Sequence, residues 1–466
     1  MKSSKQKLQE LLKQRKQQVV SHISPLKPGD LMKKLSFGQE RLWFLCEYMG
    51  PNPVYNIPLR IRLNGDLNAT VLINSLRAIV ARHEILRTNF QKVDDQLVQV
   101  IHSRLPEISI ETIDSYAQLF ILCAEEQNYL FNLSQDNLCR IRLLQDSSDS
   151  AGSSHILLIT MHHSIFDAWS TGIFFNELAI FYDAYLQTEA PDFPPLPIQY
   201  ADYANWQRQW LQGEVLDAQL NYWRKQLHNI PALLSLPTDR PRPPKQTFNG
   251  RTEPFILSEA LVQNLHALAQ ARGVSLFMVL LAGFAVLLSR YSGQKDLTIG
   301  TPIANRRQKE TETLIGFFVN TLVLRCDLTA NPDFNEFIQR IRKVTLDAYT
   351  YQDVPYEKLV EELNPERNLA YSPLFQVMFS LQNNEAGEAT KKHNLQMAPL
   401  TFNSDDGALE AKVARYDLTF NLEQHAGCIV GGLEYNSDLF ERSTISRMLE
   451  HFEQLLQVFV ANPSTR

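Results

Sequence analysis

Two adjacent histidines and an aspartate form the segment of this 466-residue sequence that best suits chemistry. His162 and His163 follow a continuous apolar run, Ile156–Met161, and Asp167 comes four residues after the second histidine. A histidine accepts a proton near neutral pH, which other side chains do only when strongly perturbed. The apolar run is typical of a strand buried on both faces, and loops at strand ends often present catalytic groups. The segment therefore indicates acid–base chemistry by histidine.

The rest of the sequence narrows the chemistry that such a histidine would serve. No His-Glu-x-x-His segment or Cys-x-x-Cys pair accompanies the loop, so we expect no metal. The Gly-x-Ser-x-Gly pattern of α/β hydrolases does not occur either. A purely structural histidine is the common alternative, because many buried polar groups serve only hydrogen bonding. A histidine base without an evident protein nucleophile favours transfer between two bound substrates.

Strands and helices alternate around this loop. Apolar residues recur at helical spacing directly after it, at Phe174, Leu178, Phe181 and Tyr185. The patterns also predict strands over 55–63, 297–300, 318–324, 375–381 and 416–422, helices over 69–83 and 334–351, and one Trp-rich helix containing Trp206, Trp210 and Trp223. Ser258 and Ser275 are expected to be helix N-caps. We expect an α/β fold of two lobes of similar size.

The predicted domain organisation has three parts. Residues 1–34 comprise a polar helix over 1–20 and a linker, with the packed structure beginning near Leu35; this helix is either a loose extension or a docking element. Residues 35–200 are expected to form the N-terminal lobe and residues 201–466 the C-terminal lobe. The most hydrophobic stretch, Val274–Leu288, is too short to span a bilayer and predicts a buried core helix.

Composition excludes several classes of function. The net charge of −6 and the pI near 6.0 argue against nucleic acid as a partner, because phosphate binding requires a basic field. The five cysteines are widely spaced, which favours a reducing compartment and buried thiols. The basic N-terminus lacks the apolar run of a signal peptide. We therefore expect a soluble, cytoplasmic protein with no membrane contact.

Seven segments of the sequence together carry a resemblance to a known family. In chain order they are LSFGQERLWFL (35–45), RHEILRTNF (82–90), HHSIFDAWS (162–170), YADYANWQ (200–207), IGFFVNT (315–321) with Arg325, YQDVPYE (351–357) and NLAYSPLFQVMF (368–379). The third resembles the HHxxxDG signature of the superfamily that includes chloramphenicol acetyltransferase. All seven, in this order, resemble the motifs of condensation domains of nonribosomal peptide synthetases.

This resemblance implies a fold, an activity and a set of partners. The fold would consist of two chloramphenicol-acetyltransferase-like lobes in a V-shaped pseudo-dimer, with a tunnel between them. The activity would be formation of an amide bond between a donor aminoacyl or peptidyl thioester and an acceptor aminoacyl thioester. Both would arrive on phosphopantetheine arms of carrier proteins, so the domain itself would bind no cofactor. An adenylation domain would be its neighbour in a longer synthetase.

The resemblance also implies roles for individual residues. His163 would be the catalytic residue, and His162 would anchor the loop. Asp167 would form a structural ion pair, for which Arg306 is our candidate partner. Four further residues are expected near the substrate, with core packing as the alternative for each: Asn320 and Thr321 lining the tunnel, and Trp169 and Ser170 packing behind the loop.

Two positions depart from the family pattern. Ala168 stands where the signature has glycine, so it either restricts the donor side of the tunnel or is merely tolerated. Gly38 stands where the family usually has alanine, a change that we expect to be harmless. The paired histidines distinguish the chain from heterocyclisation domains, and the first segment is similar to that of domains that accept an L-configured donor. Two alternatives stay open: a free-standing acyltransferase using a soluble amine or alcohol, and a non-catalytic module that recruits other enzymes.

Overall fold

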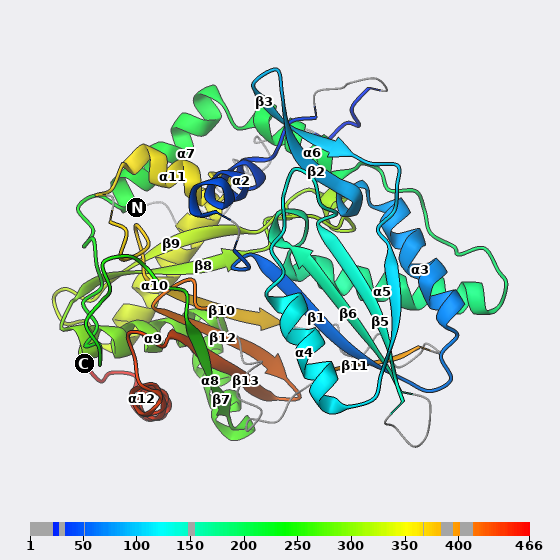
Figure 1. The fold of residues 1–466 in the computed structure, drawn as a ribbon. Helices are drawn as coiled ribbons and strands as arrows, with labels where there is room; N and C mark the ends of the chain where they lie inside the picture. Colours follow the sequence, from blue (N-terminus) through cyan, green and yellow to red (C-terminus); the bar gives the residue numbers. More distant parts are fainter. Residues whose placement is uncertain are drawn as a thin grey trace.

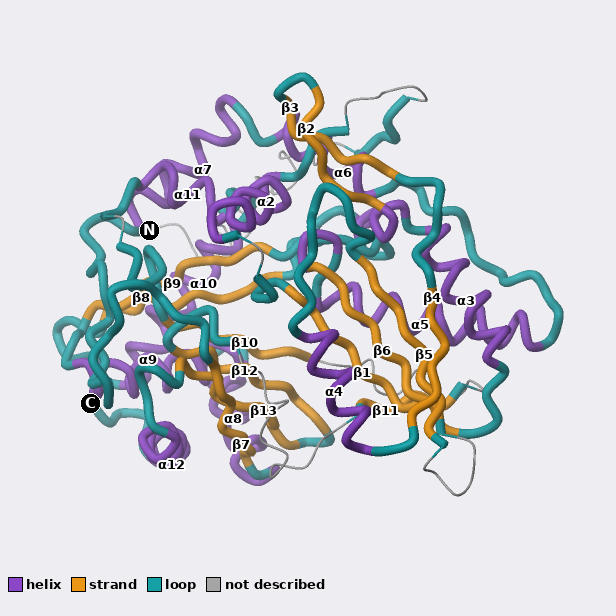
Figure 2. Tube along the Cα trace, viewed as in Figure 1, coloured by secondary structure: helices purple, strands orange, loops and turns teal. Residues whose placement is uncertain are grey.

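The computed structural model of the chain describes residues 22–27, 33–50, 52–147, 154–366, 368–383, 395–400 and 413–466. Its strands form a five-stranded sheet, a six-stranded sheet and a two-stranded ribbon. Figure 1 shows the two larger sheets side by side, each with its own helices, and Figure 2 shows the same division by element type. The helix predicted over residues 1–20 lies outside the described residues.

The first lobe is built on the five-stranded sheet, whose strand order is β11-β1-β6-β5-β4. Leu157 and Ile159 of β6 pack with α3 and α5 on one face, whereas Ile156 and Leu158 pack with α4 on the other. This alternation is the period of a strand buried on both faces, which confirms the interpretation of the apolar run. The elements are β1 (Asn56–Asn64), α3 (Ala69–Arg82), η1 (Glu84–Arg87), β2 (Thr88–Val93), β3 (Gln96–Ile101), β4 (Ile108–Ile113), α4 (Tyr116–Gln127), β5 (Cys139–Asp146), β6 (His155–His162), η2 (His163–Ile165) and α5 (Ala168–Leu186).

The second lobe is built on the six-stranded sheet, in the order β7-β13-β12-β10-β8-β9, with α8, α9, α10 and α12 packed against it. Its elements are β7 (Gly250–Leu257), α8 (Glu259–Arg272), α9 (Leu276–Ser292), β8 (Asp296–Ile303), η3 (Lys309–Thr311), β9 (Asn320–Asp327), α10 (Phe334–Thr350), β10 (Val377–Asn383), β12 (Leu418–His425), β13 (Cys428–Asn436) and α12 (Arg442–Ala461). Helix α9 is the predicted core helix. The predicted N-caps at Ser258 and Ser275 are confirmed, since each side chain accepts a backbone N–H of its helix.

Helices α2 (Phe37–Met49), α6 (Tyr200–Trp210), α7 (Gly213–Gln226) and α11 (Tyr356–Leu363) complete the fold. Helix α2 contacts both η2 of the first lobe and α11 of the second, and in Figure 1 it lies above the junction of the two sheets. Within the described part of the chain, no single helix is long and apolar enough to cross a membrane; α8 and α9 meet that test only as a pair bent by 103°.

The structure corrects three expectations. Strand β11 (Gln396–Pro399) pairs with β1 of the first lobe, so the division at residue 200 does not hold for this segment; it is drawn in orange beside β1 in Figure 1. The Trp-rich helix is two helices, α6 and α7, because the backbone is extended at Gln212 (φ −149°). The packed structure begins before Leu35, since Ile23 is fully buried in the first core and the N–H of Leu26 donates to Asp202 at 2.7 Å.

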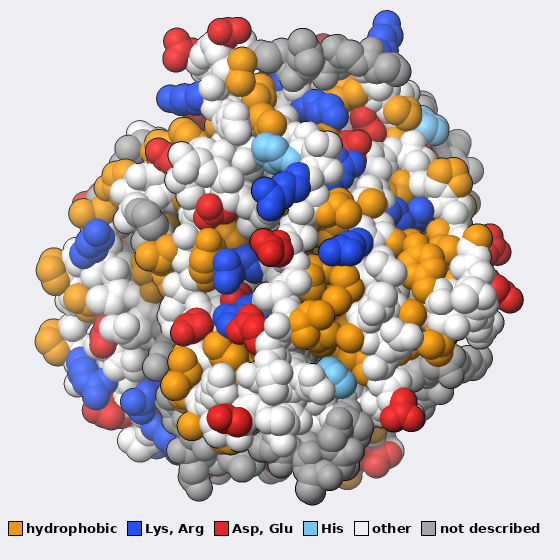
Figure 3. Space-filling view, turned by 45° about the vertical axis from the view of Figure 1, so that its right-hand side comes forward, with side chains coloured by type: hydrophobic (Ala, Val, Ile, Leu, Met, Phe, Trp, Pro, Cys, Tyr) orange, Lys and Arg blue, Asp and Glu red, His pale blue; other side chains and the backbone are white. Residues whose placement is uncertain are grey.

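The face drawn in Figure 3 has a mixed surface. Hydrophobic side chains gather there in a patch, beside Lys, Arg, Asp and Glu side chains that are interspersed rather than separated by sign.

Candidate active site

A short turn at the end of β6 presents the paired histidines. Strand β6 ends at His162, η2 begins at His163, and Asp167 caps the N-terminus of α5. The backbone N–H of His163 donates to the carbonyl oxygen of Tyr55 at 2.8 Å. The side-chain amide of Gln39 on α2 donates to the carbonyl oxygen of Ser164 at 3.1 Å. The turn is therefore fixed by backbone contacts on two sides.

The hydrogen bonding of His163 determines which ring nitrogen is free. Its Nδ1 lies 2.7 Å from the carbonyl oxygen of Phe166. A carbonyl oxygen only accepts, so Nδ1 carries the hydrogen and Nε2 keeps its lone pair. Burial, and after it the nearby Arg415, lower the pKa of His163 to about 4. The imidazole is therefore neutral at pH 7, with an unprotonated Nε2.

His162 is a buried structural side chain. Its Nδ1 lies 2.8 Å from Oγ of Ser164 and accepts the backbone N–H of the same serine at 3.3 Å. The ring packs edge-on against Tyr55 and Phe131, and its Nε2 lies 3.8 Å from Sγ of Cys46. Burial lowers the pKa of His162 to about 3. These contacts fit the anchoring role that we expect for it.

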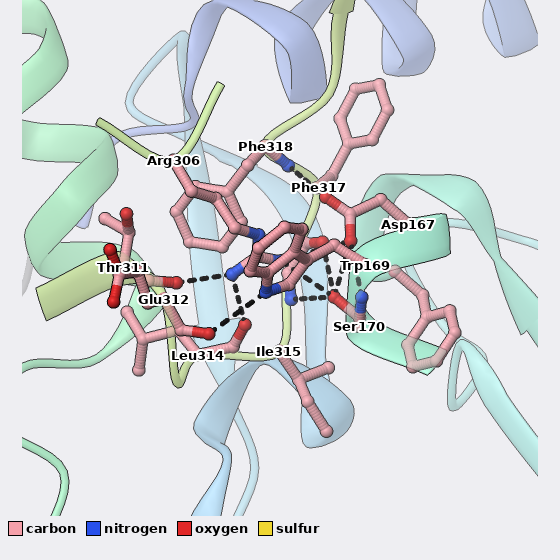
Figure 4. A network of polar contacts seen from close by, with 12 residues as sticks. Asp167, Trp169, Ser170, Arg306, Thr311, Glu312, Leu314, Ile315, Phe317 and Phe318 are labelled. Atoms are coloured by element: carbon pink, nitrogen blue, oxygen red, sulfur yellow. Dashed lines mark hydrogen bonds and ion pairs between the residues drawn. The ribbon is translucent and has the colours of Figure 1, made fainter. Parts of the chain in front are cut away.

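Asp167 is the centre of the polar network drawn in Figure 4. Its Oδ1 accepts the N–H of Ser170 at 2.9 Å, the hydroxyl of Ser170 at 2.7 Å and Nη2 of Arg306 at 3.1 Å. Its Oδ2 accepts the N–H of Phe318 at 3.0 Å. The carboxylate thus caps α5 and at the same time binds a loop of the second lobe.

Arg306 lies in the loop between β8 and β9 (residues 304–319), hereafter the β8–β9 loop. Its Nη1 donates to the carbonyl oxygens of Thr311 and Leu314, at 2.5 and 2.6 Å. The guanidinium also lies over the ring of Phe318, 4.1 Å from its centroid. Burial lowers the pKa of Arg306, although the carboxylate of Asp167 opposes this shift. One side chain therefore shapes the loop internally and ties it to the first lobe.

Other residues that bind this loop were not singled out from the sequence. The N–H of Ile315 donates to Nδ1 of His83 at 3.4 Å. The hydroxyl of Tyr200 donates to the carbonyl oxygen of Phe317 at 2.6 Å, and Oγ of Ser36 lies 2.9 Å from the same hydroxyl. His83, Tyr200 and Ser36 all lie in segments that carry the family resemblance. That resemblance was the one feature of the sequence that could have pointed to them.

Ala168 and Trp169 line a hollow of about 1550 Å³ where the two lobes meet. Its walls come from α5, from β1 and β11, from residues 193–197 and 309–313, and from Gln382 of β10. Trp169 is 49% exposed and its indole N–H donates to the carbonyl oxygen of Glu312 at 3.0 Å; it borders the hollow rather than packing behind the loop. Ser170, by contrast, is fully buried. His163 is not among the lining residues.

Asn320 is placed differently from the tunnel position that we expected. Its amide nitrogen donates to the carbonyl oxygens of Gln352 and Val354, at 2.8 and 2.9 Å. Its Oδ1 accepts the N–H groups of Thr321 and Tyr356, at 2.8 and 3.0 Å. The side chain is buried and its contacts join the start of β9 to the start of α11, so it serves the backbone. Thr321 is partly buried beside it.

Within the described ranges, no group of three or more His, Cys, Asp or Glu side chains is arranged to hold a metal ion. Both ring nitrogens of His162 and Nδ1 of His163 contact protein atoms rather than a metal ion; Nε2 of His163 has no such contact among the described residues. Two α/β lobes around a histidine at a strand end define a chloramphenicol-acetyltransferase-like fold, and the comparisons with solved structures bear this out.

Sequence comparisons give the family. The family model of the Condensation domain matches residues 32–466. One of the linear gramicidin synthase proteins of Brevibacillus parabrevis is 44% identical over 446 residues, which are 94% of this chain and 6% of that synthase protein. Malpinin synthetase of Mortierella alpina is 40% identical over 458 residues, which are 97% of this chain and 6% of the synthetase. The chain belongs to the condensation-domain family of nonribosomal peptide synthetases, and it spans a small part of these relatives.

Solved structures agree with this assignment. The X-domain from teicoplanin biosynthesis superposes with a TM-score of 0.85 at 28% identity, over 96% of this chain and 98% of that one. Two further structures, each under 25% identical, share the fold. They are the four-domain nonribosomal peptide synthetase AB3403 (TM-score 0.81, 23% identity, 96% of this chain and 34% of that one) and the condensation domain of the Monacolin K polyketide synthase MokA (TM-score 0.80, 21% identity, 93% and 98%).

Proposed function

We propose that this chain joins a donor aminoacyl or peptidyl thioester to an acceptor aminoacyl thioester through an amide bond at His163. The observation that carries the proposal is the state of that side chain. Its Nδ1–H is held by the carbonyl oxygen of Phe166, and its Nε2 has no hydrogen-bond partner among the described residues. A neutral imidazole with one open nitrogen is what an amine nucleophile requires of its partner.

The reaction would be the aminolysis of the donor thioester by the acceptor amine. The acceptor amine nitrogen attacks the carbonyl carbon of the donor thioester, and a C–N bond forms as the C–S bond breaks. The phosphopantetheine arm of the donor leaves as a thiolate, and the proton lost from the amine protonates the thiolate sulfur. Nε2 of His163 either relays that proton or accepts a hydrogen bond that orients the amine. Both roles need the neutral ring.

Positioning should contribute more than proton transfer. Holding two reactants in alignment can supply about 7–11 kcal/mol, whereas a general base typically adds about 10²–10⁴-fold. Aminolysis of a thioester is downhill, so the catalyst has only to align the reactants and manage one proton. The hollow at the junction of the lobes is large enough to admit substrate groups. Ala168 and Trp169, at the start of the helix that follows the His163 turn, line it, whereas His163 itself does not.

The partners in this proposal are two carrier proteins, each bringing its substrate on a phosphopantetheine arm, and a neighbouring adenylation domain. The similarity to synthases and synthetases far longer than this chain supports it. The wording of the first segment, residues 35–45, favours an L-configured donor. No cofactor is proposed for the domain itself.

A recruitment module is the second candidate. The similarity to the teicoplanin X-domain favours it, because one solved structure is a complex of that X-domain with OxyB. The open Nε2 of His163 favours catalysis instead. A free-standing acyltransferase differs from both in accepting a soluble amine or alcohol.

One experiment separates these candidates. Two carrier proteins are loaded with defined aminoacyl arms, incubated with the full chain, and analysed for dipeptidyl product by mass spectrometry. We expect product on the acceptor carrier in the presence of the wild-type chain, and only background with His163→Ala. Equal product from a free amine would favour the free-standing enzyme. Absence of product from all amines would overturn the catalytic proposal.

A further inference from the structure

The imidazole of His163 has an aromatic neighbour that comes from the other lobe. The ring of Phe317, in the β8–β9 loop, lies 5.0 Å from the imidazole centroid, with an angle of 66° between the planes. This is the edge-to-face arrangement that aromatic pairs prefer. The hydrogen bond from Nδ1 to Phe166 restrains one edge of the imidazole, and Phe317 packs against the ring itself.

The backbone on both sides of Phe317 is held by residues of the first lobe. The N–H of Gly316 donates to Oγ of Ser170 at 3.1 Å, and the N–H of Phe318 donates to Asp167 at 3.0 Å. Figure 4 shows these contacts converging on the loop segment that carries Phe317. Phe318 is buried in the core of the first lobe, while the ring of Phe317 lies beside the imidazole of His163.

The packing of α2 leaves room for this ring only because residue 38 is glycine. A Cβ placed on Gly38 would lie 2.8 Å from Cε1 and 3.2 Å from Cδ1 of Phe317. Carbon atoms in contact normally stay about 3.5 Å or more apart. The backbone of Gly38 has no positive φ, so the close approach of the phenyl ring is what this glycine serves. A methyl group at residue 38 would require the phenyl ring of Phe317 to shift.

We infer that Phe317 is a positioning residue: delivered by the β8–β9 loop, it holds the imidazole of His163 in the plane that directs Nε2 to the reactants. The inference rests on the proposed function of His163. It links the Asp167 network to the chemistry, because the contacts of Asp167 and Ser170 with the loop determine where the phenyl ring lies. It also makes the orientation of His163 depend on how the second lobe sits against the first.

The first test measures kinetics of the full chain with loaded carriers. Phe317→Ala should lower kcat by roughly 10- to 100-fold, in line with the cost of misplacing a reacting group by about 1 Å, and leave KM within about twofold. Phe317→Leu, which retains bulk, should recover most of that loss. Phe277→Ala is the matched control, since Phe277 is also partly buried and packs against Phe379 at 5.6 Å in the other core.

The second test does not depend on turnover. In protein labelled with ¹⁵N-histidine, wild-type His163 should show one tautomer, with hydrogen on Nδ1. Phe317→Ala should shift and broaden the ring-nitrogen signals, because the imidazole then keeps only the restraint of its hydrogen bond to Phe166, and Phe277→Ala should leave them unchanged. If the wild-type chain forms no product but the shifts respond, the proposed function fails while the positioning holds. Unchanged shifts and unchanged kcat in Phe317→Ala would overturn the inference.

A third variant tests the role of Gly38. Gly38→Ala should displace the phenyl ring and lower kcat, and the same change in a Phe317→Leu background should cost less, because leucine is the smaller side chain. Such coupling is the non-additivity expected of residues in contact. Additive effects of the two substitutions on kcat would contradict the contact on which this step depends.

Discussion

Arg306 and Asp167 lie 139 residues apart in the sequence and in contact in the fold. Nη2 of Arg306 is 3.1 Å from Oδ1 of Asp167, and each side chain is only 2% exposed. The pair joins the turn that carries His163 to the β8–β9 loop of the other lobe. Removing one member leaves a buried charge without its counterion, which typically costs about 3–5 kcal/mol.

We therefore expect Asp167→Ala and Arg306→Ala each to lower the free energy of unfolding by roughly 3–5 kcal/mol, measured by urea denaturation. Lys358→Ala is a suitable control, because Lys358 pairs with Glu361 at 3.2 Å with the side chains 33% and 73% exposed, and exposed pairs contribute less than about 1 kcal/mol. In a double-mutant cycle the two buried substitutions should be strongly non-additive. Additive effects would show that the ion pair does not couple these residues energetically.

The sequence predicts the individual helices, strands and caps around this site, but it does not predict how distant segments come together there. Strand β6, the start of α5 and the caps of α8 and α9 follow from apolar periodicity and Ser residues within one segment. The contacts of His83, Tyr200 and Phe317 depend on how segments more than 100 residues apart meet, and no local pattern encodes that. The family resemblance marked their segments without giving their geometry.

Strand β11 illustrates a second limit. It has four residues and, in the part of the chain that the structure describes, it pairs with β1, more than 300 residues earlier. A strand this short has too few residues to show alternation, and its position is determined by the sheet edge that it meets. The Trp-rich region shows a third limit. Helices α6 and α7 are similar in composition, and the extended backbone at Gln212 that separates them is not marked by a proline.

His163→Ala should nearly abolish condensation while leaving the unfolding midpoint unchanged. Loss of a general base typically lowers the rate by about 10²–10⁴-fold, and among the described residues the side chain makes one hydrogen bond, to Phe166. Single-turnover assays with both carriers loaded measure the effect, and circular dichroism verifies the fold. A well-folded variant that turns over at a near wild-type rate would refute the assignment of His163 as catalytic.

Stability should depend on pH through His163. Burial lowers its pKa to about 4, against about 6.5 in the unfolded chain. Between these values the unfolded state binds more protons than the folded state, so the free energy of unfolding falls as the pH is lowered from 6.5 toward 4. The slope for one such histidine is at most about 1.4 kcal/mol per pH unit.

Urea denaturation of the wild-type chain and of His163→Ala at pH 7, 6 and 5 tests this dependence. The variant lacks this titration and should lose less stability on acidification, so that the difference between the two proteins changes by up to about 1.4 kcal/mol between pH 6 and 5. Burial also lowers the pKa of His162, to about 3, and this histidine is present in both proteins. Parallel pH profiles would contradict the burial of the His163 ring.

Ala168 is the position where substrate range should respond to a single methyl group. It is the first residue of α5, after the Asp167 cap, and it has no positive φ, so the backbone does not require the glycine of the family signature. Its side chain is exposed to the hollow between the lobes. We expect Ala168→Gly to accept a bulkier donor, or to turn over faster, while losing at most about 1 kcal/mol of stability.

The opposite change should have the opposite effect. Ala168→Leu adds volume at the same wall and should slow bulky donors more than small ones, with little change in the unfolding midpoint because the site is exposed. Thr171→Ala is the matched control: it also widens the hollow, one turn further along α5 and away from the His163 turn. Competition between a small and a bulky donor thioester, followed by mass spectrometry, gives the ratio of kcat/KM values directly. If neither Ala168 variant shifts that ratio, the methyl group does not face the donor, and Ala168 is only a tolerated start of the helix.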